Sequence, residues 1–321
     1  MLDKVDLNKK LAKTVYKRLM PELRSRLFRV QKASWDAGIP VIILFEGWDA
    51  AGKGTSIQQL TRPLDPRGYK LYPIRAARTY EKRHPWLWRF WLKTPARGEW
   101  AIFDRSWYGR VMVERVEELI PEKQWRRAYR DIVDFERTLA DDGHLIIKFF
   151  LHISRVEQKR RFEKLSRDPL TAWHVTEEDW EHYRRYEDWF LAYEEAFERT
   201  ETEWGPWTIV EATDRRHTRV KIYQTVIMSL EERLGWPHEP FPNGKQPEID
   251  VATAAEAPEE VDSAQEPSTP TPTPTDAEEN EENLVGEEKV DEAIPPDRAA
   301  ETPVSEADIL DSEAVEERQP A

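Results

Sequence analysis

Cysteine is absent from this 321-residue chain. Disulfide bonds and thiolate metal sites are therefore excluded, and the composition gives no indication of secretion. Long apolar runs are also absent, since no stretch approaches the roughly 18 consecutive apolar residues that a membrane-spanning helix requires. The polar first residues, MLDKVDLNKK, contain no apolar signal core. We therefore expect a soluble cytoplasmic protein that has no membrane partner.

Aromatic residues are absent from the segment 245–321, which holds 24 acidic and 4 basic side chains. Its formal charge is −20, so the rest of the chain carries +6 of the total of −14. Such a segment buries too little apolar surface to offset the entropy of ordering it, and we predict a disordered acidic tail over 244–321. Two interpretations of this tail stay open: a solubilising spacer, or a segment that folds back on the basic part and competes with an anionic substrate.

Short apolar runs alternate with helical patterns over the remaining part of the chain. The first run, PVIILFE at 40–46, is continuous, as in a parallel strand that is covered on both faces. The other predicted strands span 70–74, 100–104, 145–153 and 207–212, and the predicted helices between them span 53–64, 121–140 and 155–165. This order predicts an α/β fold with a doubly wound parallel sheet of the P-loop nucleotide-kinase type.

An amphipathic pattern precedes the first strand. Apolar residues recur there at steps of three or four, which predicts a helix over 7–37 that Pro21 kinks or splits. We expect an N-terminal helical extension over 1–38 that packs on a kinase domain over 39–243.

A second unusual helix is predicted over 177–199, where aromatic residues recur at helical spacing. A platform for stacking a base is conceivable, but packing against the body of the protein is favoured, because such stripes are usually core.

A phosphate-binding motif follows the first predicted strand. The segment reads Gly47-Trp48-Asp49-Ala50-Ala51-Gly52-Lys53-Gly54-Thr55, and a helix comes next. Glycines allow the backbone to wrap phosphate oxygens, the helix N-terminus offers unpaired amides, and Lys53 adds a full charge. Thr55 or Ser56 can offer a hydroxyl to Mg²⁺. The predicted phosphate-binding residues of this segment are Gly47, Ala50, Ala51, Gly52, Gly54 and Thr55.

One departure from the plain motif is Gly54, which stands where Ser or Thr normally follows the lysine. The hydroxyl of Thr55 comes one place later, in the G-K-G-T order that resembles adenylate kinases.

Two carboxylates are candidates for a metal site. Asp49 lies inside the anion-binding loop, where it opposes the loop's own charge preference, so we interpret it as a metal ligand or as a group beside the transferred phosphoryl; a local turn is the alternative. Asp104 ends the predicted strand 100–104, at the edge where ligands of such sheets bind. We predict that Asp49 and Asp104 hold Mg²⁺, with Arg105 directly beside them.

Basic residues follow the predicted strands and gather at the same edge of the sheet. Guanidinium groups bind phosphate oxygens in pairs, so they suit a charge-dense substrate, although each one alone is more often a solvated surface charge. The segment 155–167 resembles the lid of nucleotide kinases, and we place a lid at about 155–199. Arg110 is the predicted phosphate ligand of this group.

Four longer motifs resemble the polyphosphate kinase 2 family: FEGWDAAGKGT, PWLWRFW, IFDRSWYGRVMVERVE and PWTIVEATDRR. The resemblance runs from about Leu7 to Leu234 and is greatest to the catalytic half of polyphosphate:AMP phosphotransferases. It implies Mg²⁺-dependent transfer of a phosphoryl group from inorganic polyphosphate to a purine nucleotide, most simply AMP. It also implies a lid that carries Arg160 and Arg161 as phosphate-binding residues, and a homo-oligomer, a dimer or a tetramer. The central catalytic residues that it implies are Asp49, Lys53, Asp104 and Arg105.

Two segments depart from the family pattern. Relatives often read A-P-T-D-E-E where this chain has Ala77-Arg78-Thr79-Tyr80-Glu81-Lys82, which leaves the choice of acceptor open. The lid's usual R-W-K is here Ala172-Trp173-His174, so its hold on phosphate is expected to be weaker.

Other functions therefore stay open: a nucleoside diphosphate acceptor, an ATP-dependent nucleotide kinase, or a non-catalytic phosphate-sensing scaffold. No motif supports a nucleic-acid partner, and the acidic tail opposes one.

Overall fold

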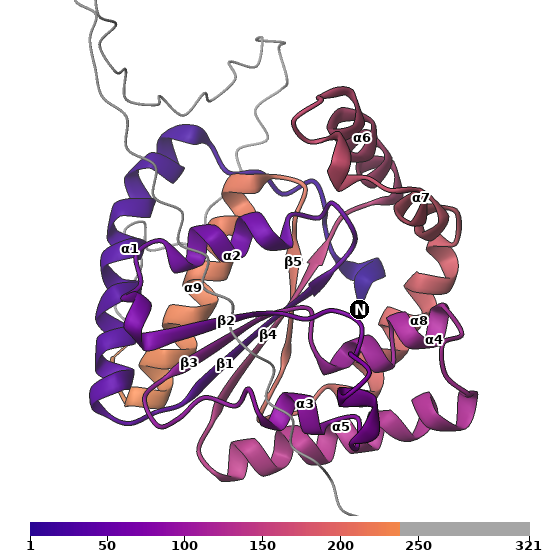
Figure 1. Cartoon of the computed structure of the whole chain (residues 1–321). Coiled ribbons are helices and arrows are strands. Elements are labelled where there is room, and N and C mark those ends of the chain that lie inside the picture. The colour runs from indigo at the N-terminus through magenta and orange to yellow at the C-terminus, as the bar shows by residue number, and fades with distance from the viewer. Residues whose placement is uncertain (238–321) are drawn as a thin grey trace, which may run out of the picture. The chain divides into compact units, whose positions relative to one another are not determined.

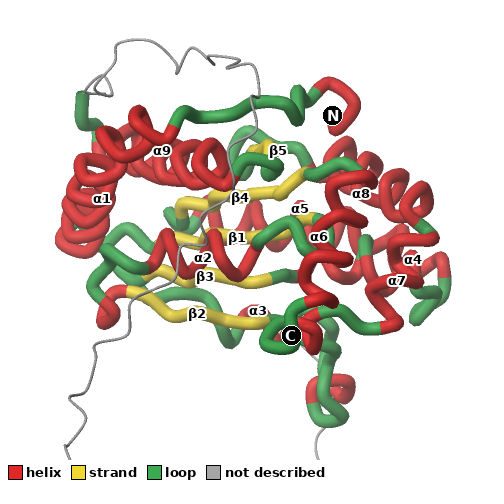
Figure 2. The backbone as a smooth tube through the Cα atoms, turned by 90° about the horizontal axis from the view of Figure 1, so that it is seen from above, coloured by secondary structure: helices red, strands yellow, loops and turns green. Residues whose placement is uncertain are grey.

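The structure, a computed structural model, describes residues 1–237. Within these residues the strands form one parallel sheet of five strands in the order β2-β3-β1-β4-β5, seen from β5 at the top to β2 at the bottom in Figure 2. The strands are β1 (Val41–Gly47), β2 (Tyr69–Pro73), β3 (Trp100–Asp104), β4 (Leu145–His152) and β5 (Trp207–Glu211). Every predicted strand is present, with ends within one residue of the prediction.

Helices cover both faces of the sheet (Figure 1). One face carries α1 (Lys13–Asp36), α2 (Lys53–Thr61) and α9 (Arg215–Leu234), and α9 contacts both of the others. The other carries α3 (Trp88–Trp91), α5 (Glu122–Asp141) and α8 (Tyr186–Thr200). The remaining α-helices of the described part are α4 (Val113–Val116), α6 (Arg155–Arg167) and α7 (Glu177–Arg184). The predicted doubly wound α/β fold is confirmed.

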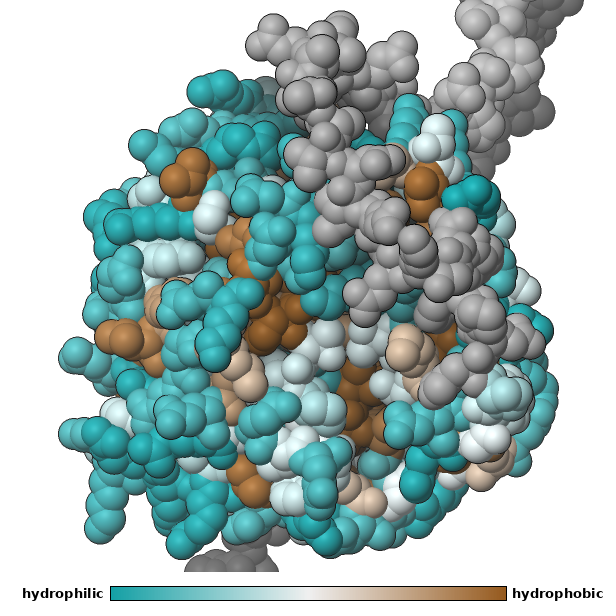
Figure 3. Space-filling view, turned by 180° about the vertical axis from the view of Figure 1, so that it is seen from behind, coloured by the Kyte–Doolittle hydropathy of each residue, from teal (hydrophilic) through white to brown (hydrophobic). Residues whose placement is uncertain are grey.

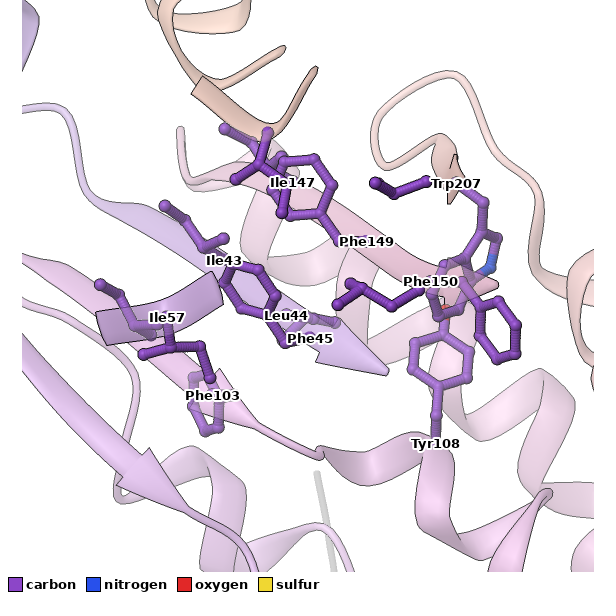
Figure 4. Packing of buried hydrophobic residues seen from close by; sticks show 14 of the residues in the cluster. Ile43, Leu44, Phe45, Ile57, Phe103, Tyr108, Ile147, Phe149, Phe150 and Trp207 are labelled. Carbon is purple, nitrogen blue, oxygen red and sulfur yellow. The ribbon is translucent and has the colours of Figure 1, made fainter. Parts of the chain in front are cut away.

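The core consists of alternating side chains from the central strands. Phe45 of β1 packs against Phe149 of β4 on one face, with ring centroids 5.2 Å apart. On the other face Tyr108 meets Trp207 at 4.6 Å, and Figure 4 shows this second group around Phe150. Because β1 is buried on both sides, its continuous apolar run is what this position in a parallel sheet requires.

Two helix predictions need correction. The N-terminal helix begins at Lys13 rather than at residue 7, and it continues through Pro21 without splitting. The preceding residues are held by tertiary bonds instead, since the Leu11 amide donates to Asp214 and Lys9 pairs with Glu211. The helix survives Pro21 because its buried face is held in the core on both sides of the proline, at Leu19, Met20 and Leu23.

The helix predicted over 177–199 is two helices, α7 and α8, that part at Arg185. The guanidinium of Arg185 reaches the carbonyl of Val116 and the carboxylate of Glu117, so tertiary contacts hold the break. The aromatic stripe packs, as favoured: Tyr193 and Phe197 are buried.

The face of the protein seen in Figure 3 is mainly hydrophilic, with hydrophobic residues scattered over it. No helix within residues 1–237 combines the length and the apolar composition needed to cross a bilayer. The predicted tail over 244–321 lies outside the described residues, and the predicted domain boundaries stay predictions.

A fully buried ion pair lies beneath the segment that follows β3. Lys148 of β4 and Glu136 of α5 are both 0% exposed, and their charged atoms are 2.9 Å apart. Glu136 also accepts hydrogen bonds from Trp107 and Tyr108, while Lys148 donates to the Thr200 carbonyl at the end of α8. The pair therefore joins the end of α8 to the residues that follow Asp104 and Arg105.

Lys148→Met is expected to lower the free energy of unfolding by about 3–5 kcal/mol, because Glu136 would stay buried without its cation. Chemical denaturation measures this loss. The control is Arg137→Met, which removes an ion pair with Asp141 whose side chains are 50% and 60% exposed and should change stability by about 1 kcal/mol or less. Equal effects of the two substitutions would contradict the interpretation of Lys148 as the necessary partner of a buried charge.

Candidate active site

The phosphate loop begins where β1 passes closest to β4. Gly47 ends β1 with φ +140°, and a Cβ atom there would lie 2.5 Å from the carbonyl oxygen of Leu151. Both the positive φ and the close approach require glycine. The sequence motif therefore begins at a position where no side chain fits.

The loop presents free amides to a ligand. Gly52 has φ +99° and precedes the first turn of α2. Within residues 1–237, the backbone amides from Gly52 to Thr55 have no hydrogen-bond partner. Such amides at a helix N-terminus form an anion site. Lys53 extends across this loop, and its Nζ donates to the carbonyls of Gly47 at 2.8 Å and Trp48 at 3.1 Å.

Asp49 is surrounded by cationic side chains. Arg105 donates to its Oδ1 at 3.0 Å, His182 lies 3.1 Å from its Oδ2, and Lys53 lies 3.9 Å away. Burial alone would raise the pKa of Asp49, but the hydrogen bond with His182 and the charges of Lys53 and Arg105 hold it below its ordinary value. Asp49 is therefore ionised in the site.

Asp104 ends β3, opposite Phe45 of β1. Its carboxylate makes no hydrogen bond or ion pair with any residue of the described part. Its charge nevertheless acts on both Lys53 and Arg105, as that of Asp49 does. Arg105 itself has φ +62°, and its amide donates to the Phe45 carbonyl at 3.0 Å. The structure thus brings Asp49, Lys53, Asp104 and Arg105 into one charged cluster.

The donor set fits a magnesium ion. Mg²⁺ prefers oxygen ligands and is commonly held by one or two carboxylates together with substrate phosphates. Asp104 offers an unengaged carboxylate, and Asp49 is held ionised beside it. No cluster of three or more His, Cys, Asp or Glu side chains within residues 1–237 suits a metal by itself, at this site or at any other.

Two charged residues of the site were missed from the sequence. Glu46 is buried beside the cluster and accepts a hydrogen bond from Ser106 at 2.7 Å; burial raises its pKa. A carboxylate at the end of an apolar strand is visible in the sequence, so Glu46 could have been predicted as a residue of the site. His182 lies on α7, far from Asp49 in sequence, within a segment whose pattern indicates aromatic packing. No local signal identifies it.

Arg110 lies at the start of the segment after β3. It pairs with Glu114 at 2.5 Å, donates to Gln124 at 2.9 Å and stacks over Trp86. Its role as a phosphate ligand stays a prediction.

The two lid arginines have different surroundings. Arg160 is 60% exposed and pairs with Glu157 at 2.8 Å. Arg161 is 14% exposed and also bonds Glu157, but its other contacts are carbonyl groups of the protein. Arg161 contacts the phosphate loop at the carbonyls of Ala50 and Ala51, and the phosphate contacts predicted for both arginines stay predictions.

Trp48 anchors the loop to the body of the protein. Its ring stacks on Tyr186 at 4.0 Å with an interplanar angle of 4°, and its Nε1 donates to Nδ1 of His152 at 2.9 Å. His152 is 4% exposed, and burial lowers its pKa to about 4. His152 is therefore neutral at neutral pH, with Nδ1 free to accept this bond.

Comparison with known proteins gives consistent matches. A family model described as polyphosphate kinase 2 (PPK2) matches residues 10–235. The polyphosphate:AMP phosphotransferase of Pseudomonas syringae pv. tomato is 41% identical over 232 residues, which cover 72% of this chain and 47% of that protein. The chain thus spans about half the length of that relative.

Two further matches extend over most of the other protein. The ADP-polyphosphate phosphotransferase 3 of Rhizobium meliloti is 35% identical over 215 residues, 67% of this chain and 76% of that one. The crystal structure of polyphosphate kinase 2 from Arthrobacter aurescens TC1 matches with a TM-score of 0.70 at 31% identity, covering 75% of this chain and 89% of that one. Fold and family model therefore agree.

The buried state of His152 predicts a loss of stability in acid. Unfolding restores the ordinary pKa of His152, about 6.5. Between pH 6.5 and about 4, the unfolded chain therefore binds a proton at His152 and the folded chain does not. The free energy of unfolding should fall by about 3 kcal/mol from this group over that window. Chemical denaturation at several pH values should show the fall for the native chain.

His152→Asn is the matched variant, because its amide oxygen can accept the Trp48 bond and does not titrate. Between pH 6.5 and about 4, the free energy of unfolding of this variant should fall by about 3 kcal/mol less than that of the native chain. A variant with an unchanged pH dependence would contradict the interpretation of His152 as neutral in the fold.

Proposed function

The chain belongs to the polyphosphate kinase 2 family, and we propose that it transfers a phosphoryl group from inorganic polyphosphate to AMP, which gives ADP. The observation that carries this proposal is the loop of free amides from Gly52 to Thr55 beside the carboxylates Asp49 and Asp104. The name of the Pseudomonas relative supports AMP as the acceptor.

The donor binds at the phosphate loop. The free amides and Lys53 hold phosphate oxygens next to the transferred group. When phosphate oxygens arrive, Lys53 exchanges its bonds to the carbonyls of Gly47 and Trp48 for bonds to the donor. The loop therefore holds its lysine in place before the substrate binds.

The transfer needs no covalent enzyme intermediate. A phosphate oxygen of AMP attacks the terminal phosphorus of polyphosphate, and the bond from that phosphorus to the bridging oxygen breaks. The bridging oxygen leaves with the electron pair on a polyphosphate shorter by one unit. Arg105, which is bound to Asp49 at 3.0 Å, neutralises charge on the oxygens as it shifts.

Asp49 and Asp104 would hold the magnesium ion of this reaction. When bound, the ion supplies charge neutralisation at the phosphate oxygens. The residues of the chain orient both substrates around it: Asp104 from the end of β3, and Asp49 from within the loop. Burial raises the pKa of Glu46, and its hydrogen bond from Ser106 holds that carboxylate beside the site.

A nucleoside diphosphate is the second candidate acceptor. The Rhizobium relative is named for ADP, and it matches this chain over a larger share of its own length than the Pseudomonas relative, which is named for AMP. The segment that departs from the family pattern, residues 77–82, is held in place here, because Glu81 accepts a hydrogen bond from the Arg78 amide at 2.8 Å and pairs with Arg89 at 3.4 Å.

Dimeric or tetrameric assembly of the chain stays a prediction.

Asp104→Asn is expected to lower the turnover rate by at least about 10²-fold, because it removes charge at the reacting phosphates. The fold should be unchanged, since this carboxylate holds no other side chain of the described part. A coupled assay of ADP formation measures the rate, and Asp134→Asn on the exposed side of α5 is the control. Near-normal turnover in Asp104→Asn would remove Asp104 from the site.

A donor and acceptor matrix on the full chain tests the function itself. Polyphosphate or ATP is offered as donor against AMP, ADP, GMP and GDP with Mg²⁺, and the products are separated by chromatography. We expect product from polyphosphate with AMP. Product with ADP or GDP instead would support the second candidate, and product only with ATP would overturn the proposal.

A further inference from the structure

We propose that Arg161 is a positioning residue that fixes the conformation of the phosphate loop, rather than a lid arginine that binds phosphate itself. It lies on the first turns of α6, one turn beyond Gln158. The inference rests on the proposed function only in taking the loop from Gly47 to Thr55 as the phosphate site.

All hydrogen-bond donors of Arg161 are engaged within the protein. A guanidinium group has five N–H donors. Nε donates to Glu157 at 2.6 Å, Nη1 donates to the carbonyls of Ala50 at 2.9 Å and Ala51 at 3.0 Å, and Nη2 donates to those of Ala212 at 2.6 Å and Thr213 at 3.2 Å. A phosphate contact would therefore require Arg161 to release part of the protein.

The loop carbonyls that Arg161 binds determine where the loop amides point. In a trans peptide the carbonyl and the following N–H point in opposite directions. When the Ala51 carbonyl is held toward α6, the Gly52 amide is directed away from α6, where it has no partner in the described part of the chain. Gln158 acts in the same way on the Asp49 carbonyl, at 3.3 Å.

The conformation that is held in this way is costly without support. Ala50 has φ +58°, a left-handed conformation that costs an L-residue about 1–2 kcal/mol. A charge-assisted bond from Arg161 to the carbonyl of this residue offsets that cost. The same guanidinium ties the loop to residues 212–213, directly after β5, so the loop is fixed to the sheet.

Arg160, the neighbouring residue, shows the contrast. It is 60% exposed and bonds Glu157 on the same helix, whereas Arg161 is 14% exposed between two loops. The first turns of α6 therefore belong to the support of the phosphate loop.

Hydrogen exchange of the ligand-free full chain tests the assignment, because a phosphate ligand has no role there. Arg161→Met should raise the exchange rate of the Trp48 and Ala51 amides, which are bonded to the carbonyls of Leu151 and Trp48, by about tenfold or more, since the loop loses its support. Arg161→Lys keeps the charge but cannot reach both loops, so it should give an intermediate rate. Arg137→Met, an exposed arginine of α5, should leave the loop unchanged.

Binding of inorganic tripolyphosphate by calorimetry is the second readout. Arg161→Met should weaken it about tenfold or more and leave its salt dependence unchanged, because the charge of Arg161 is already paired within the protein. If exchange of the Trp48 and Ala51 amides is unchanged in both Arg161 variants while binding weakens, Arg161 is a direct phosphate ligand and the assignment is wrong.

The two proposals fail separately. A loop that exchanges faster in the Arg161 variants supports the positioning role even if the native chain transfers no phosphoryl group. If the native chain transfers the phosphoryl group and the loop amides of the variants exchange at an unchanged rate, only the positioning role is contradicted. If Arg161→Met does not fold, Arg161→Lys carries the same test.

Discussion

The parallel pairing of β1 with β3 on one side and β4 on the other is the constraint on which the site depends. Its register sets Phe45 opposite Asp104 and Gly47 opposite Leu151. The strand that leads into the phosphate loop therefore ends beside the strand that delivers the carboxylate. A slip of one residue in either pairing would turn every side chain of the strand to the other face and separate Asp104 from Lys53.

The loop that leaves β1 is held from several directions by side chains distant in sequence. Trp48 is stacked on Tyr186, and Asp49 is bound by His182, both from the two helices that part at Arg185. Arg105 holds Asp49 from the side of β3. Side chains of the protein bind the loop's carbonyl groups, and within the described part of the chain the amides at the start of α2 stay free. The same contacts therefore make the loop rigid and leave its amides available to an anion.

The sequence predicted the elements whose patterns are local. The apolar runs gave all strands within one residue, and the glycine and lysine spacing gave the loop. Pro21 does not split its helix, because burial of the residues on both sides overrides a local rule. His182 and the contacts of Arg161 could not be predicted, because a histidine or an arginine in a helix gives no sign of which distant carbonyl or carboxylate it will meet. The charge of Arg161 suggested a ligand, while its surroundings depend on tertiary packing.

The balance of the Asp49 charge by cationic side chains has a consequence for how the site fills. Its two oxygens already face an arginine and a histidine, and a lysine lies close by. A cation that joins Asp49 therefore competes with those that the protein supplies. Ligand entry at this carboxylate is an ion exchange, and the displaced side chains become available to the incoming phosphates. The affinity of the site then depends on the difference between the bonds that these side chains make within the protein and the bonds that they make with a ligand. A small difference allows a product to leave as readily as a substrate enters.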